Sequence, residues 1–107
     1  MGDKHIAVAN VLIDIEAAMR ELQLWQAEPP SAEALASDQP FAINTLTFVQ
    51  WLQFLFLPRL QQLVQSRGDL PSSCNIAPMA EEYFRPMSLP VERLIIELKR
   101  IDTLLNQ

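Results

Sequence analysis

The chain has 107 residues and a formal net charge of −5; half of its residues are hydrophobic and 20% are charged. A chain of this length forms one domain, 1–107, that buries a core without disulfide or metal support. The acidic charge repels a phosphate backbone, so direct nucleic-acid binding is disfavoured. Two glycines against eight prolines also disfavour a hairpin-rich β fold, whose turns need residues with positive φ.

The single cysteine, Cys74, excludes an intramolecular disulfide and is compatible with a reducing compartment. The N-terminus does not read as a signal peptide, and the longest apolar run is far shorter than the roughly 20 residues of a membrane span. We therefore predict a cytoplasmic protein with no membrane segment. A reactive thiol at Cys74 would need a lowered pKa; a small, partly buried residue is the favoured interpretation.

The first predicted element is an amphipathic helix over 3–27, because apolar residues recur there at steps of three and four. Asp3 is suited to cap its N-terminus. Pro29-Pro30 is expected to end it, since a proline disfavours helix at the preceding residue. A short helix is expected to follow over 31–36.

The most apolar stretch of the chain predicts a central helix over 48–67. Thr47 and Gln50 have the spacing of a capping box at its start. Pro58 removes one backbone hydrogen bond and clashes with a preceding carbonyl, so we expect a kink or a break there. Gly68 is the expected left-handed residue that ends the helix.

Two further helices complete the pattern. A short helix is expected over 78–84, with Pro78 in its first turn. A third main helix is expected over 89–106, capped by Ser88. Its solvent side is predicted to carry five charged residues: Glu92, Glu97, Lys99, Arg100 and Asp102. The prediction is an all-α fold, a small multihelical bundle of three main helices and one or two short ones.

No catalytic constellation is visible in the sequence. The only histidine, His5, lies near a fraying terminus and is expected at the surface, where it makes a poor general base. Cysteine, histidine and glutamate do not occur at the spacings of zinc or di-iron sites. Both glycines are isolated, so there is no phosphate-binding loop. We predict no enzymatic activity, no cofactor and no metal site.

Two groups of residues form the candidate surface for a partner or ligand. Trp51 and Arg59 would form a cation–π pair if the kink brought their turns together; a core Trp51 with Arg59 at the surface is the favoured alternative. The second group is large apolar residues on short elements, among them Phe41, Tyr83 and Phe84. Most are expected to cover the central helix, and any that stay exposed as one patch would form a partner site.

Residues 38–85 resemble the YqcC-like family of small bacterial proteins. The resemblance is carried, in order and spacing, by Gln39-Pro40-Phe41, Thr45, Trp51-Leu52-Gln53, Pro58-Arg59, Leu70-Pro71 and Ile76-Ala77-Pro78. The sequence departs from the family pattern at Asn44, Phe48 and Met79-Ala80. The resemblance implies an all-α domain of unassigned function, often encoded beside a tRNA pseudouridine synthase.

The leading hypothesis is a non-enzymatic protein-interaction or accessory domain whose partner is the neighbouring synthase or another component of tRNA modification. The alternative is a small-molecule-binding domain with a pocket beside the Pro58 kink, lined by Trp51, Phe54, Arg59 and Tyr83. A third hypothesis is homodimerisation through the first or the last helix, since both keep near-heptad stripes. Direct tRNA binding is the least favoured.

Overall fold

The computed structural model describes residues 3–29 and 46–106, and every regular element in these ranges is helical. This confirms the predicted all-α fold. The predicted helix over 31–36 lies outside the described residues, as does Phe41. The elements in chain order are α1 (Lys4–Glu21), α3 (Phe48–Trp51), η2 (Leu52–Phe56), α4 (Leu57–Ser66), α5 (Ile76–Phe84) and α6 (Glu92–Leu105).

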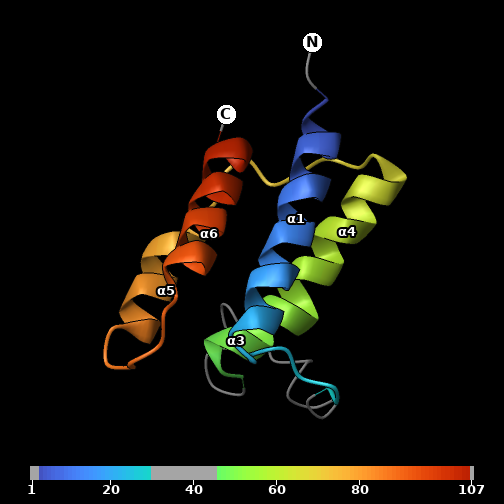
Figure 1. The fold of residues 1–107 in the computed structure, drawn as a ribbon. Coiled ribbons are helices and arrows are strands. Elements are labelled where there is room, and N and C mark those ends of the chain that lie inside the picture. Colours follow the sequence, from blue (N-terminus) through green and yellow to red (C-terminus); the bar gives the residue numbers. More distant parts are fainter. Residues whose placement is uncertain (1–2, 30–45, 107) are drawn as a thin grey trace.

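The helices are arranged around α1, which lies between α4 and α6, while α5 packs against α6 (Figure 1). α3, η2 and α4 follow one another without a gap. The core between the helices consists largely of aliphatic side chains that are at most 1% exposed, among them Val8, Ile15, Leu52, Leu60 and Leu98. No described helix is long and apolar enough to cross a membrane.

α1 ends earlier than the sequence indicated. The carboxylate of Asp3 accepts the N–H of His5 at 2.9 Å, which confirms the predicted N-cap. The helix stops at Glu21, however, because Gln23 adopts the left-handed conformation with φ 60°. The N–H groups of Gln23 and Leu24 then bond to the carbonyls of Arg20 and Met19, which ends the helix. The predicted extension to residue 27 is therefore wrong. The chain turns there so that Trp25 can lie under the guanidinium of Arg20, 4.9 Å from the ring centroid.

The central helix begins as predicted and passes Pro58 without a break. Thr47 and Gln50 form the predicted capping box, with reciprocal bonds of 3.0 and 3.1 Å. The chain then forms one wide π-turn, in which the N–H of Leu57 bonds to the carbonyl of Leu52. Pro58 falls in the first turn of α4, directly after this wider turn. The helical segment is thus interrupted by the π-turn over Leu52–Phe56, directly before Pro58, and stays helical through Pro58.

The residue that ends α4 in the left-handed region is Arg67, with φ 53°, and the expectation of Gly68 in that role is wrong. Gly68 is the following residue, and its N–H bonds to the carbonyl of Leu63 at 2.8 Å. A Cβ at Gly68 would lie 3.0 Å from Leu63 Cδ2. Glycine is therefore favoured here by close packing and not by positive φ.

α5 begins two residues before the predicted start, and α6 begins at Glu92, after the predicted start at 89. Ser88 is consequently not the cap of α6; Val91 holds that position without a side-chain bond. Two of the five residues predicted on the solvent side of α6 are buried, because each has a polar partner: Glu97 is 6% and Asp102 9% exposed. Glu97 binds Arg100 through both oxygens, at 2.8 and 2.9 Å.

Candidate functional site

Three aromatic rings from α3 and α5 form the wall of a groove. The ring of Phe48 lies between those of Trp51 and Tyr83, with centroid distances of 6.0 and 5.6 Å. The groove has a volume of about 420 Å³. We call it the aromatic groove, and its lining residues are Leu46, Thr47, Phe48, Trp51, Met79, Glu82 and Tyr83.

The local backbone explains how Trp51 is held. The capping box fixes the start of α3, one turn before Trp51. Residues five apart lie on different sides of an ordinary α-helix, but the wider π-turn brings them closer to the same side. The rings of Trp51 and Phe56 accordingly lie in contact, tilted by 34°, with a centroid distance of 5.2 Å. Trp51 is thereby held by ring contacts with both Phe48 and Phe56.

Tyr83 is positioned by the packing of α5. Its neighbour Phe84 is 3% exposed and makes edge-on contacts with Tyr83 at 5.0 Å and with Phe48 at 6.3 Å. Phe84 thus anchors the helix in the core, while Tyr83 remains partly exposed in the groove. The aromatic groove therefore rests on two helices fixed by buried contacts.

The groove has an apolar lining and a polar rim. Glu82 is the one charged residue among its lining residues, and it pairs with Arg85 at 2.8 Å in an exposed ion pair. The hydroxyl of Thr47 already accepts the N–H of Gln50. A site of this kind suits apolar or aromatic groups of a protein partner or a small molecule.

The structure separates the predicted surface residues. Trp51 and Tyr83 line the aromatic groove, whereas Phe84 lies buried behind it. Arg59 is exposed on α4 and is not among the residues that line the groove. Within the described ranges, the cation–π contact is made by Arg20 with Trp25, and Arg59 does not stack on Trp51.

The groove does not lie where the sequence predicted a pocket. The predicted site beside Pro58 included Phe54 and Arg59, and neither lines the aromatic groove. Phe48 lines it without having been predicted as a site residue, whereas Met79 is one of the apolar residues on short elements from which a partner site was expected. The capping box was the available signal for Phe48, since it fixes the first turn of α3 and the direction in which that ring points.

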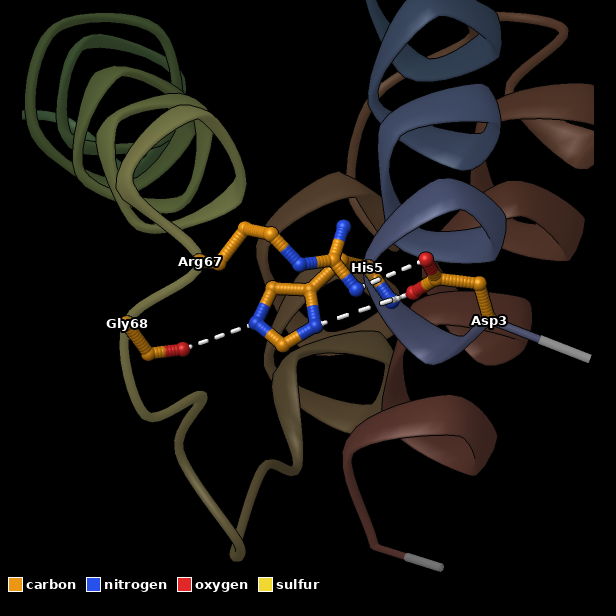
Figure 2. A network of polar contacts seen from close by, with 4 residues as sticks. All are labelled: Asp3, His5, Arg67 and Gly68. Atoms are coloured by element: carbon orange, nitrogen blue, oxygen red, sulfur yellow. Dashed lines mark hydrogen bonds and ion pairs between the residues drawn. The ribbon is translucent and has the colours of Figure 1, made fainter.

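A polar network joins the N-terminus of α1 to the end of α4 (Figure 2). His5 Nε2 donates to the carbonyl of Gly68 at 2.8 Å, and Arg67 donates to the Asp3 carboxylate at 2.7 Å. The hydrogen bond from Arg67 lowers the pKa of Asp3 below 3.8. His5 is half-buried and holds a tertiary contact, so the expectation of a surface histidine is wrong.

The thiol of Cys74 is buried and donates to Asp102 Oδ1 at 2.9 Å. Burial and the nearby carboxylate raise its pKa from 9.0 to about 12. Only the thiolate is a good nucleophile, so this cysteine is held in its unreactive form. This agrees with the favoured sequence interpretation. No group of three or more His, Cys, Asp or Glu within residues 3–29 and 46–106 is placed to hold a metal ion.

Comparison with known proteins gives one family and several relatives. The family described as tRNA pseudouridine synthase C matches residues 7–104. An uncharacterised protein of Haemophilus influenzae is 37% identical over 95 residues, which are 89% of each chain. The uncharacterised protein YqcC of Escherichia coli is 30% identical over 100 residues, 94% of this chain and 92% of that protein.

Two further similarities extend the comparison. The solution NMR structure of E. coli YqcC has a TM-score of 0.83 and covers 97% of this chain and 89% of that chain. A protein of Pectobacterium carotovorum named tRNA pseudouridine synthase C is 46% identical over 66 residues. These are 62% of this chain but only 18% of that protein, so most of the longer protein lies outside the match.

Proposed function

The chain belongs to the YqcC-like family, and from that premise we propose that it is a non-enzymatic accessory domain that binds a tRNA pseudouridine synthase through the aromatic groove. The two relatives of similar length are uncharacterised proteins, so their names supply no activity. We place this function in the cytoplasm. The proposal assigns the chain to binding and leaves the chemistry to its partner.

The observation that carries the proposal is the match to the longer Pectobacterium protein. A region like this chain there occupies 18% of a protein named tRNA pseudouridine synthase C. Two domains joined in one chain are held together by a high effective concentration. When the same domains are separate chains, they need a binding surface of their own to stay associated.

The aromatic groove supplies such a surface on this chain. Aromatic residues are enriched among those that contribute most of the binding energy in protein interfaces, and Phe48, Trp51 and Tyr83 lie together in the groove. Met79 adds a flexible apolar side chain that adapts to the shape of a partner. The rim carries Glu82 and Thr47, which can orient a partner by polar contacts.

The test is isothermal titration of this chain with tRNA pseudouridine synthase C from the same organism. We expect Tyr83→Ala and Met79→Glu to weaken binding by about tenfold or more, as hot-spot substitutions do. Arg59→Ala is the matched control, because Arg59 is exposed but lies outside the groove. Circular dichroism checks that each variant keeps its helices. Absence of binding by the wild-type chain would overturn the proposal.

The non-enzymatic part of the proposal is tested separately. The chain alone is incubated with unmodified tRNA, and pseudouridine is measured by mass spectrometry after chemical labelling. We expect none above the level of a blank. Formation of pseudouridine by the isolated chain would overturn this part, whatever the outcome of the binding experiment.

A second candidate function is small-molecule binding in the same groove. Its volume of about 420 Å³ and its aromatic lining favour this candidate, since ligand sites are commonly concave, apolar and of this size. Titration with indole, followed by NMR, tests it. Saturable shifts confined to residues that line the groove would support the candidate, and shifts spread over the whole surface would contradict it.

A further inference from the structure

The sulfur-containing side chains of the described residues differ in their access to solvent. Met19 is fully buried in the core and Cys74 is 8% exposed. Met87 is 41% exposed in the segment between α5 and α6. Met79 is partly exposed on α5 and lines the aromatic groove. Met79 therefore combines access to solvent with a place in the candidate site.

The aromatic groove is large enough to admit a small oxidant to Met79. Its volume of about 420 Å³ is many times the roughly 30 Å³ that one water molecule occupies in the liquid. Hydrogen peroxide exceeds water by a single oxygen atom, so it fits in the same space. Among the groups that line the groove, the thioether of Met79 is the one that a peroxide oxidises readily.

The other sulfur atom with redox chemistry of its own does not compete for the oxidant. A thiol reacts as the thiolate, and the thiol of Cys74 keeps its proton as a donor to Asp102 Oδ1 at 2.9 Å. Burial and this carboxylate raise the pKa of Cys74 to about 12. Met19 is shielded by the core. A peroxide is therefore left with Met79 and Met87 in the described part of the chain.

We infer that Met79 is a reversible oxidation site at which a peroxide converts the aromatic groove from an apolar to a more polar surface. The thioether sulfur attacks one oxygen of hydrogen peroxide, and the O–O bond breaks. The sulfur loses two electrons and becomes a sulfoxide, while the other oxygen leaves with both hydrogen atoms as water. A methionine sulfoxide reductase reverses the step, because two thiols supply two electrons, form a disulfide and release the oxygen as water.

The sulfoxide changes what the groove can bind. Its oxygen is a hydrogen-bond acceptor that is hydrated in the free chain. An apolar group that enters the groove would displace this water without offering a donor in its place, and an unpaired buried polar group costs free energy. The consequence for the synthase rests on the proposed function: oxidation of Met79 is expected to weaken its binding by about tenfold.

The first experiment locates the oxidation. The full chain is treated with hydrogen peroxide, and each methionine is followed by peptide mass spectrometry. We expect Met79 and Met87 to gain one oxygen each in the folded chain, while Met19 and Cys74 stay reduced. In urea, where the fold no longer protects it, Met19 should react as fast as Met79. The inference fails if Met79 of the folded chain is oxidised no faster than Met19.

The second experiment measures the change in the groove without a partner. Trp51 lines the groove, and its indole N–H signal should shift in NMR spectra when the wild-type chain is oxidised. The shift should be absent from Met79→Leu, since leucine has a similar volume and is not oxidised. Met87→Leu is the matched control and should keep the shift, because Met87 does not line the groove. A shift of equal size in oxidised Met79→Leu would rule out Met79 as its cause.

The third experiment compares the binding of tRNA pseudouridine synthase C by each protein before and after oxidation, using isothermal titration. Wild-type chain should bind about tenfold more weakly once oxidised, and methionine sulfoxide reductase should restore its affinity. For Met79→Leu the two affinities should be the same. Equal affinities of reduced and oxidised wild-type chain would overturn the inference. If the reduced wild-type chain does not bind, the proposed function fails, and the first two experiments still decide whether Met79 is the oxidation site that alters the groove.

Discussion

The carboxylate of Asp102 accepts a hydrogen bond from the thiol of Cys74 at 2.9 Å, across 28 positions of the sequence. The same carboxylate accepts the backbone N–H groups of Ile76 and Ala77, each at 2.9 Å. Asn106, one turn further along α6, donates to the carbonyl of Cys74 and accepts its N–H. α6 thus supplies the N-terminal cap of α5, whose own N-cap residue makes no side-chain bond.

The first prediction concerns the stability that this cap supplies. Asp102→Ala leaves two buried N–H groups and a thiol without their acceptor, and hydrogen bonds to charged groups contribute about 1.5–3 kcal/mol each. We expect the free energy of unfolding to fall by about 3 kcal/mol. This is less than the sum of the three hydrogen bonds, because water takes the place of the carboxylate as a partner for some of the groups. Urea denaturation followed by circular dichroism measures it.

Glu92→Ala is the control for this prediction, since Glu92 is an exposed carboxylate on the same helix. It should change the free energy of unfolding by no more than about 0.5 kcal/mol, as surface substitutions do. A loss equal to that of Asp102→Ala would show that the effect comes from the charge of α6 and not from the cap.

The second prediction concerns the pH dependence that Cys74 imposes. Its folded pKa is raised to about 12 from 9.0, so above pH 9 the unfolded chain loses the thiol proton while the folded chain keeps it. The stability from this group is therefore complete below pH 9 and declines between pH 9 and 12. The expected slope is about 1.4 kcal/mol per pH unit. Urea denaturation between pH 8 and 11 measures it.

Cys74→Ala removes the titrating group and should flatten this part of the curve. The difference in stability between the two proteins should therefore narrow as the pH rises above 9. A native thiol that reacts quickly with Ellman's reagent at neutral pH would contradict the buried, protonated state on which the prediction rests.

The third prediction concerns Asp3 and Arg67. The hydrogen bond from Arg67 lowers the pKa of Asp3 in the folded chain below its ordinary value of 3.8. The stabilisation from this pair is therefore present above pH 3.8 and is lost as the pH falls through the pKa of Asp3 in the folded chain. We expect Arg67→Ala to move the pKa of Asp3 upward in a carbon-detected NMR titration. Arg59→Ala, which removes another exposed arginine of the same helical segment, should leave the titration unchanged.

The fourth prediction concerns Gln53, which is 5% exposed and binds the segment after α1. Its amide donates to the carbonyl of Gln26 at 2.7 Å and accepts its N–H at 2.8 Å. Gln53→Ala should lower the free energy of unfolding by about 2 kcal/mol, because the N–H and the carbonyl of Gln26 both lose their side-chain partner. Gln50→Ala removes a partly exposed amide of the capping box and should cost about 1 kcal/mol. Equal losses would contradict the tertiary role of Gln53.

Much of the helical architecture follows from local signals. Hydrophobic periodicity predicts the existence of each described helix, because an amphipathic stripe depends only on neighbouring residues. The caps at Asp3 and Thr47 are also local, and both are confirmed. Where boundaries are wrong, a distant or packed residue decides: Asp102 extends the start of α5, and Arg67, paired with Asp3, takes the left-handed position expected of Gly68.

By itself the sequence determined an all-α chain with a helical core and a family resemblance, because composition and periodicity fix which faces must be buried. Only the tertiary structure decided which partly buried residues meet. It brings Trp51 and Tyr83 together, buries Phe84 and leaves Arg59 apart. It also makes a cap of Asp102, which the helical pattern alone places in solvent. The physical reason is that long-range contacts depend on how helices pack, and no local pattern encodes that packing.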